Sequence, residues 1–149
     1  MTKFFQAFLS GVFFTFFLDF FLILGMKLNY IDYYNIDLYY NPFFADNQNI
    51  YIYLLFTTIF AILITYVENT KLSIFVIGSL FIASLSTFIH PIGHAIASRI
   101  FIQKNVEIQT KRFSYKGDIY YEGREHIHFY DYELKKIIHI KKKDLKNEI

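Results

Sequence analysis

The chain has 149 residues, of which 54% are hydrophobic and 21% aromatic, with a formal net charge of +2. So apolar a composition excludes an ordinary soluble globule of this length, which would leave much of its surface in water. The apolar residues gather in long blocks, as expected for membrane-spanning helices. The lack of cysteine excludes disulfides, thiolate metal sites and cysteine nucleophiles. Abundant Phe, Tyr, Ile, Lys and Asn without Trp is typical of an AT-rich, bacterial genome.

The first apolar block, Phe4 to Met26, predicts a transmembrane helix about 34 Å long. It is longer than the apolar region of a cleavable signal peptide and is not followed by a small-residue cleavage site, so we expect it to be retained. Small residues recur at every fourth position and predict close packing against a second helix. These are Ala7, Gly11 and Thr15. Asp19 continues this stripe, and its carboxylate should face protein or water because a charge in lipid is costly.

A tyrosine-rich segment, residues 27–49, is too polar to span and is predicted to lie in the headgroup region. The alternative is a partner-binding loop. Residues 50–67 form a second apolar block, near the lower length limit for crossing. The polar stretch 68–71 predicts a tight turn that makes the second and third spans antiparallel neighbours.

The third block, residues 72–98, predicts one helix that is kinked at Pro91. Two stripes with four-residue spacing run along it. The first is a small face predicted to pack closely, made of Ser79, Ala83 and Thr87. The second is a polar face that includes Ser86, His90 and His94.

Asp19, Ser86, His90 and His94 form the candidate intramembrane polar cluster, because helix rise places Asp19 and His90 at similar depth. Three interpretations remain open. A carboxylate–imidazole pair, or bonds to Ser86 and Thr87, would lock two helices together. Intramembrane Asp and His also mark proton or ion paths. Two histidines four residues apart could hold a metal with Asp19, although Pro91 distorts that spacing. No metal or cofactor is therefore predicted.

From Gln103 the chain becomes charged and alternating, and residues 103–149 predict a small β-meander. We expect turns at 116–118, at 122–124 and between 131 and 135, and a frayed end over 141–149. The meander is near the size at which domains need outside support. A hairpin turn at Glu133 and Leu134 would place His128 opposite His139. With His126 these residues could bind metal, but surface histidines are the simpler interpretation.

The predicted fold is an all-α membrane protein, with residues 1–102 forming three transmembrane helices (4–26, 50–67 and 72–98) and a small C-terminal β-meander tail. Lys and Arg near the membrane are more frequent on the tail's side, which predicts a cytoplasmic tail in a multi-pass protein of the bacterial inner membrane. The motifs of phosphate-binding loops, nucleophile elbows and catalytic triads do not occur, so enzymatic activity is not expected.

The expected function is that of an accessory, scaffold or assembly subunit of a membrane complex. The alternative is an ion- or proton-handling protein that uses the Asp/His cluster. Expected partners are the lipid bilayer and a membrane protein or a second copy of the chain. Nucleic acid is not expected, because acidic residues dilute the positive charge of the tail.

Overall fold

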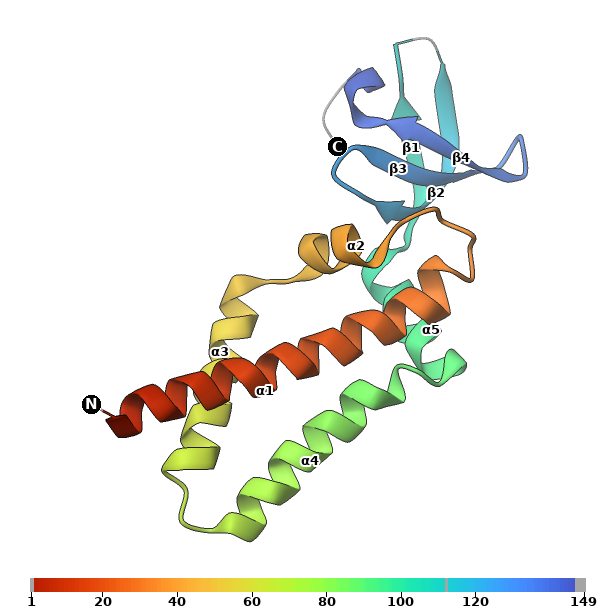
Figure 1. The fold of residues 1–149 in the computed structure, drawn as a ribbon. Helices are drawn as coiled ribbons and strands as arrows, with labels where there is room; N and C mark the ends of the chain where they lie inside the picture. Colours follow the sequence, from red (N-terminus) through yellow and green to blue (C-terminus); the bar gives the residue numbers. More distant parts are fainter. Residues whose placement is uncertain (1, 112, 147–149) are drawn as a thin grey trace. The chain divides into compact units, whose positions relative to one another are not determined.

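The computed structural model describes residues 2–111 and 113–146. Within these residues, five α-helices precede a four-stranded antiparallel sheet (Figure 1). The chain divides into two compact units, the first ending at Gly93 and the second beginning at His94. These are called the helical unit and the sheet unit below, and each is described by itself.

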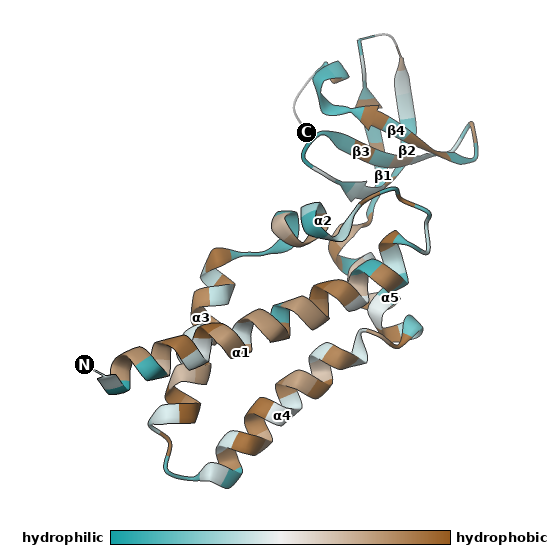
Figure 2. Cartoon of the chain, in the orientation of Figure 1, coloured by the Kyte–Doolittle hydropathy of each residue, from teal (hydrophilic) through white to brown (hydrophobic). Residues whose placement is uncertain are grey.

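Helix α1 (Thr2–Met26) continues through a π-helical turn, η1 (Lys27–Ile31), into one apolar helix of 30 residues. Among the described residues it is the single helix that is long and apolar enough to cross a membrane without help from a neighbour. Two bent helix pairs would raise the number of candidate spans to three if each pair is one span. The pairs consist of α2 (Tyr40–Asn47) with α3 (Ile50–Thr65), and of α4 (Thr70–Ser86) with α5 (His90–Phe101). Apolar residues predominate on α1, α3 and α4, with a few polar bands between them (Figure 2).

Asparagine side chains fix where α3 and α4 begin. Asn49 accepts hydrogen bonds from the backbone N–H groups of the first turn of α3, and Asn69 does the same for α4. Such caps satisfy donors that have no partner inside the helix. Only four residues separate α3 from α4, which confirms the predicted tight turn. The Ser73 hydroxyl donates to the Leu63 carbonyl oxygen (2.7 Å) beside this turn.

The region predicted as one kinked helix over 72–98 is divided into two helices. Helix α4 ends at Ser86, and the axis turns by 86° before α5. Pro91 lies in the first turn of α5, where its missing N–H group removes no helical hydrogen bond. The predicted tyrosine-rich loop likewise contains a short helix, α2, which meets α3 at 82°.

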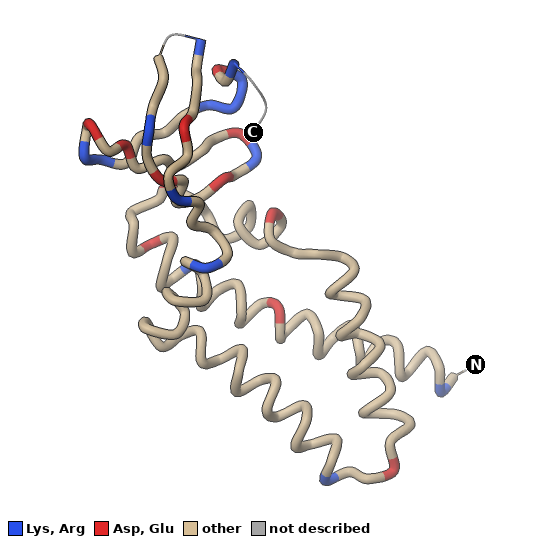
Figure 3. Tube along the Cα trace, turned by 180° about the vertical axis from the view of Figure 1, so that it is seen from behind, with Lys and Arg blue, Asp and Glu red and all other residues tan. Residues whose placement is uncertain are grey.

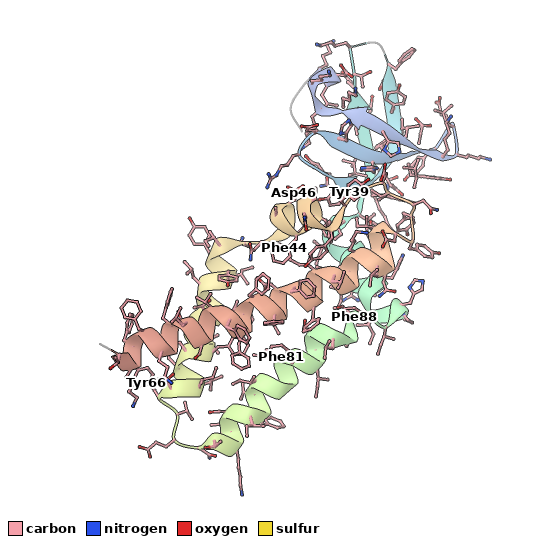
Figure 4. The ribbon with its side chains drawn as sticks, viewed as in Figure 1. Tyr39, Phe44, Asp46, Tyr66, Phe81 and Phe88 are labelled. Atoms are coloured by element: carbon pink, nitrogen blue, oxygen red, sulfur yellow. The ribbon has the colours of Figure 1, made fainter. Side chains whose placement is uncertain are left out.

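Helix α1 is the axis of the helical unit. The Thr57 hydroxyl of α3 donates to Thr15 (3.4 Å), and the Ser84 hydroxyl of α4 donates to the Leu18 carbonyl oxygen (2.8 Å). Near the other end of α3, the Lys3 ammonium lies 5.2 Å from the Tyr66 ring centre. The Thr57 and Tyr66 contacts show that α3 runs antiparallel to α1. Ser84 lies at Leu18 and Thr87 at Gly25, so α4 runs parallel to α1. Phe81 and Phe88 point toward α1 from the α4 side (Figure 4) and meet the rings of Phe14 and Phe21.

The sheet unit is a meander in the strand order β1-β2-β3-β4, which confirms the predicted antiparallel tail. The strands are β1 (Gln103–Gln109), β2 (Ser114–Glu122), β3 (His126–Asp131) and β4 (Lys136–Lys141). The turn predicted at 116–118 is wrong, because Gly117 lies inside β2 and pairs with Val106 and Asp131. A Cβ at Gly117 would overlap the Tyr130 carbonyl oxygen, so this glycine permits close strand approach instead of a turn.

A compact apolar core stabilises the sheet unit. Its fully or almost fully buried members are Ile108, Ile119, Ile127, Phe129 and Ile140. The chain after β4 curls back to β1 through a short 3₁₀ helix, η2 (Lys142–Asp144), and bridges Thr110 to Leu145. The predicted fraying therefore does not apply to residues 142–146, and 147–149 lie outside the described residues.

A hydrogen-bond network joins β1, β2 and the residue that follows β3. The Tyr132 hydroxyl donates to Asp118, which also accepts from the Asn105 backbone N–H group (3.0 Å). The hydrogen bond to Asp118 raises the pKa of Tyr132 above its usual range. Asn105 has a positive φ of 56° at a register shift in β1, so the network supports the bulge at this position.

Candidate functional site

Asp19 is the candidate site in the helical unit, because it is the one Asp, Glu, Lys or Arg between Phe4 and Met26. Its carboxylate is partly buried and accepts a hydrogen bond from the Gln48 side chain. Gln48 is the C-cap residue of α2. The chain reverses its direction after α1, and this reversal places Gln48 beside the middle of α1. The carboxylate thus faces protein, as predicted for a charge within so apolar a helix.

Two tyrosines complete the surroundings of Asp19. The hydroxyls of Tyr40 on α2 and Tyr53 on α3 are close enough to interact electrostatically with the carboxylate. Both hydroxyl protons are used elsewhere: Tyr40 donates to the Phe20 carbonyl oxygen (3.4 Å) and Tyr53 to that of Val12 (3.0 Å). The group therefore ties α2 and the start of α3 to the backbone and side chains of α1.

The histidines predicted to lie beside Asp19 contact other residues. The His90 ring lies 5.1 Å from the ring of Tyr33, and His94 belongs to the sheet unit, where its Nδ1 is 3.3 Å from the Ser98 hydroxyl. Ser86 donates to the Ala83 carbonyl oxygen of its own helix (2.6 Å). The structure thus brings Asp19 together with Gln48 and not with His90.

The end of α4 explains this difference. The α4 residue level with Asp19 is Ser84, whose hydroxyl reaches the Leu18 carbonyl oxygen. Thr87 already lies beside Gly25, nearly two turns further along α1. The sequence estimate of depth assumed a continuous helix from His90 to Arg99 across the membrane, whereas the chain turns by 86° before His90.

In the predicted small stripe of α1, Gly11 and Thr15 pack against α3 and not against α4. Ala7, Gly11 and Thr15 are buried, and a Cβ added to Gly11 would overlap the Thr57 carbonyl oxygen. On α4, Ser79 and Ala83 of the predicted small face are exposed. Thr87 is fully buried beside Gly25. Close contact between α4 and α1 is therefore made by Ser84 and Thr87, one turn apart.

Asn29 is a structural residue that the sequence did not single out. Its side-chain amide donates to the carbonyl oxygens of Thr87 (2.8 Å) and Gly25 (3.1 Å). Because α4 ends at Ser86, the Thr87 carbonyl has no following helical turn to supply a donor. Asn29 supplies that donor from the end of α1. The asparagine sits just after the apolar block, but its target depends on where α4 stops.

The histidines of the sheet unit show the predicted register. His128 pairs with His139 across β3 and β4, and their ring centres are 4.5 Å apart in an edge-to-face arrangement. His128 is buried, with 5% of its surface exposed, so it is not the surface histidine expected. Throughout residues 2–111 and 113–146, no group of three or more His, Cys, Asp or Glu side chains is arranged to hold a metal ion.

The hydrogen bond between Gln48 and Asp19 predicts a local effect on α2. Gln48→Ala should free this end of α2 and speed hydrogen exchange of its amides by about fivefold, as expected for the loss of one hydrogen bond of ~1 kcal/mol. Asp19→Asn keeps an oxygen acceptor for Gln48 and should leave exchange close to that of the unmodified protein. Exchange is measured by mass spectrometry on the full chain in detergent.

Asn41→Ala is the matched control, because Asn41 is an exposed amide on the same helix. If Gln48→Ala and Asn41→Ala changed the exchange of α2 equally, the Gln48 bond would have no anchoring role.

Comparison of the chain with protein-family models, with curated proteins and with solved structures finds no match.

Proposed function

We propose that this chain is a small integral protein of the bacterial inner membrane that acts as an accessory, scaffold or assembly subunit of a larger membrane complex. The first support is the outward surface of the helical unit. Many large apolar side chains on α1 and α4 are exposed, among them Phe4 (67%), Phe75 (73%) and Ile82 (71%). Apolar surface of this extent is stable only against lipid or another protein.

In this proposal α1, α3 and α4 cross the bilayer. With 16 and 17 residues, α3 and α4 are about 24 and 26 Å long, which is slightly less than a hydrocarbon core of about 30 Å. The bend of 86° would turn α5 into the plane of the headgroups, on the side where α1 ends, whereas α2 lies beside the middle of α1. The tyrosines just after α1 (Tyr30, Tyr33 and Tyr34) suit the headgroup level, because their rings are apolar and their hydroxyls polar.

The main support for the accessory role is that the buried polar side chains of the helical unit form hydrogen bonds between helices. Thr15, Thr57, Ser73, Ser84 and Thr87 all hydrogen-bond to neighbouring helices. Gln48 uses the Asp19 carboxylate in the same way. These groups hold helices together, and the outward faces are left apolar. Such a unit is suited to anchoring and to contact with other membrane helices, not to catalysis.

Charge supports a cytoplasmic sheet unit. Lys27, Arg99 and Lys104 lie close to the membrane on that side, whereas the other side carries Lys3 and Lys71. Charged residues gather on the sheet unit and are sparse along the helices (Figure 3).

Copurification tests the proposal. The full chain with a C-terminal tag should resist extraction by sodium carbonate, and in mild detergent it should elute with a partner or as a larger assembly. Mass spectrometry then identifies the partner. A monomer that carries no other protein would contradict the accessory role, and release by carbonate would contradict membrane insertion.

The alternative function, ion or proton handling, is supported by the carboxylate in the middle of α1. The Asp19→Asn variant separates the two functions. An accessory subunit keeps its partner when the charge is removed, whereas a proton-handling protein in liposomes would lose proton uptake reported by an internal pH dye.

A further inference from the structure

The sheet unit carries one surface on which cations and an exposed aromatic ring lie together. Lys111, Phe113, Lys141 and Lys143 line the same surface hollow, and Lys146 lines the adjoining one with Lys111 and Phe113. We call these five residues the basic face. Phe113 is 63% exposed, although a phenylalanine in water is unfavourable.

The fold, and not the sequence order, assembles the basic face. Lys111 and Phe113 follow β1, whereas Lys141, Lys143 and Lys146 come from the end of β4 and the segment after it. The Thr110–Leu145 bridge joins the two segments. Two backbone hydrogen bonds support it, from Lys111 to the Asp144 carbonyl oxygen (3.1 Å) and from Lys146 to that of Gln109 (2.9 Å).

The charges of this face are not neutralised within the described residues. Lys142 points to Glu122 and forms a salt bridge of 2.6 Å, but the four lysines of the basic face form no ion pair in residues 2–111 and 113–146. Asp144 is the one carboxylate that lines the hollow. The face therefore presents several free ammonium groups around one apolar ring.

We infer that the basic face docks on the anionic phospholipid headgroups of a bilayer, with the Phe113 ring inserted at the interface. Clustered lysines attract anionic lipid, and an exposed aromatic ring adds apolar contact at the headgroup level. The short connection to the helices favours lipid over other partners, because β1 begins two residues after α5 ends. A tethered unit meets the membrane at high effective concentration. This inference rests on the proposed membrane insertion of the helical unit.

The lack of tryptophan in the chain makes the test direct, since Phe113→Trp introduces the sole indole. The full chain is reconstituted into phosphatidylcholine liposomes with or without phosphatidylglycerol, including brominated lipids as quenchers. Docking predicts a shift to shorter wavelength and strong quenching with phosphatidylglycerol, both reduced by salt. Leu134→Trp, at a position of similar exposure (53%) in the β3–β4 turn, should stay unquenched.

Charge reversal tests the lysines in the Phe113→Trp background. Lys141→Glu with Lys143→Glu should reduce docking by at least roughly fivefold for each lysine. The matched control, Lys135→Glu with Lys136→Glu, makes the same change of net charge at the end of the β3–β4 turn and the first residue of β4, and should have little effect. Equal losses in the two double variants would overturn a specific basic face.

Other outcomes separate the possible failures. If the protein stays in the liposomes but Phe113→Trp is unquenched with phosphatidylglycerol, the inference fails while the membrane proposal stands. If carbonate releases the protein, the membrane proposal itself fails. If added RNA or inorganic phosphate shifts the emission and phosphatidylglycerol does not, the face serves another anion and the inference is overturned.

Discussion

Replacing Gly11 with leucine should separate α1 from α3 and lower the free energy of unfolding of the helical unit by about 3 kcal/mol or more. A Cβ at Gly11 already overlaps the backbone carbonyl of Thr57, and Ala61 lies beside it. A backbone carbonyl does not swing away as the end of a long side chain would, so the helices themselves must move apart. This movement would also break the Thr15–Thr57 hydrogen bond.

The measurement is the fraction of protein that remains monodisperse in detergent after heating. Gly78→Leu is the matched control, because a Cβ added at Gly78 of α4 meets no atom within 4 Å. It should be neutral or slightly stabilising, since glycine is a poor helix former. Equal losses of stability in both variants would show that Gly11 has no special role in packing.

Replacing Phe129 with alanine should unfold the sheet unit or bring it close to unfolding. Phe129 is fully buried at the centre of the core and pairs with Ile119 and Ile138 on its two neighbouring strands. Truncating such a ring costs about 3–5 kcal/mol, which is a large part of the stability expected for so small a unit.

Hydrogen exchange of the full chain in detergent measures this effect. Amides of β2 and β3 should lose their protection in Phe129→Ala, while amides of α1 keep theirs. Phe113→Ala removes the same ring from an exposed position and should leave the sheet protected. Retained protection in Phe129→Ala would mean that the core tolerates the cavity.

Local patterns in the sequence predicted the elements with some success. The apolar block from Phe4 to Met26 became α1, and the polar residues before Thr70 became a tight turn that ends at Asn69, the residue that caps α4. Alternation after Gln103 predicted strands, and the turn near Glu133 was sufficient to place His128 opposite His139. Each of these features depends on residues that are close together in the chain.

The partner of Asp19 was not predictable in this way. Its place depends on how far each helix continues before the chain turns, and Pro91 alone did not indicate a bend of 86° or an end of α4 at Ser86. In the sequence Gln48 belongs to the polar segment 27–49, and nothing near it in the chain predicts a partner. The fold of α2 and α3 places it beside Asp19 of α1. Gly117 was misread for a similar reason, because its role depends on the neighbouring strand.

Hydropathy and spacing act along the chain, so they were sufficient to predict the apolar helices, the polar antiparallel tail and the small and charged residues available for contacts. Which of these residues meet became known from the fold: Asp19 with Gln48, Gly11 with Thr57, and the lysines of the basic face with one another. Such pairings depend on where each helix ends and bends, and on which strands lie side by side. These depend on packing between distant segments, which no local pattern records.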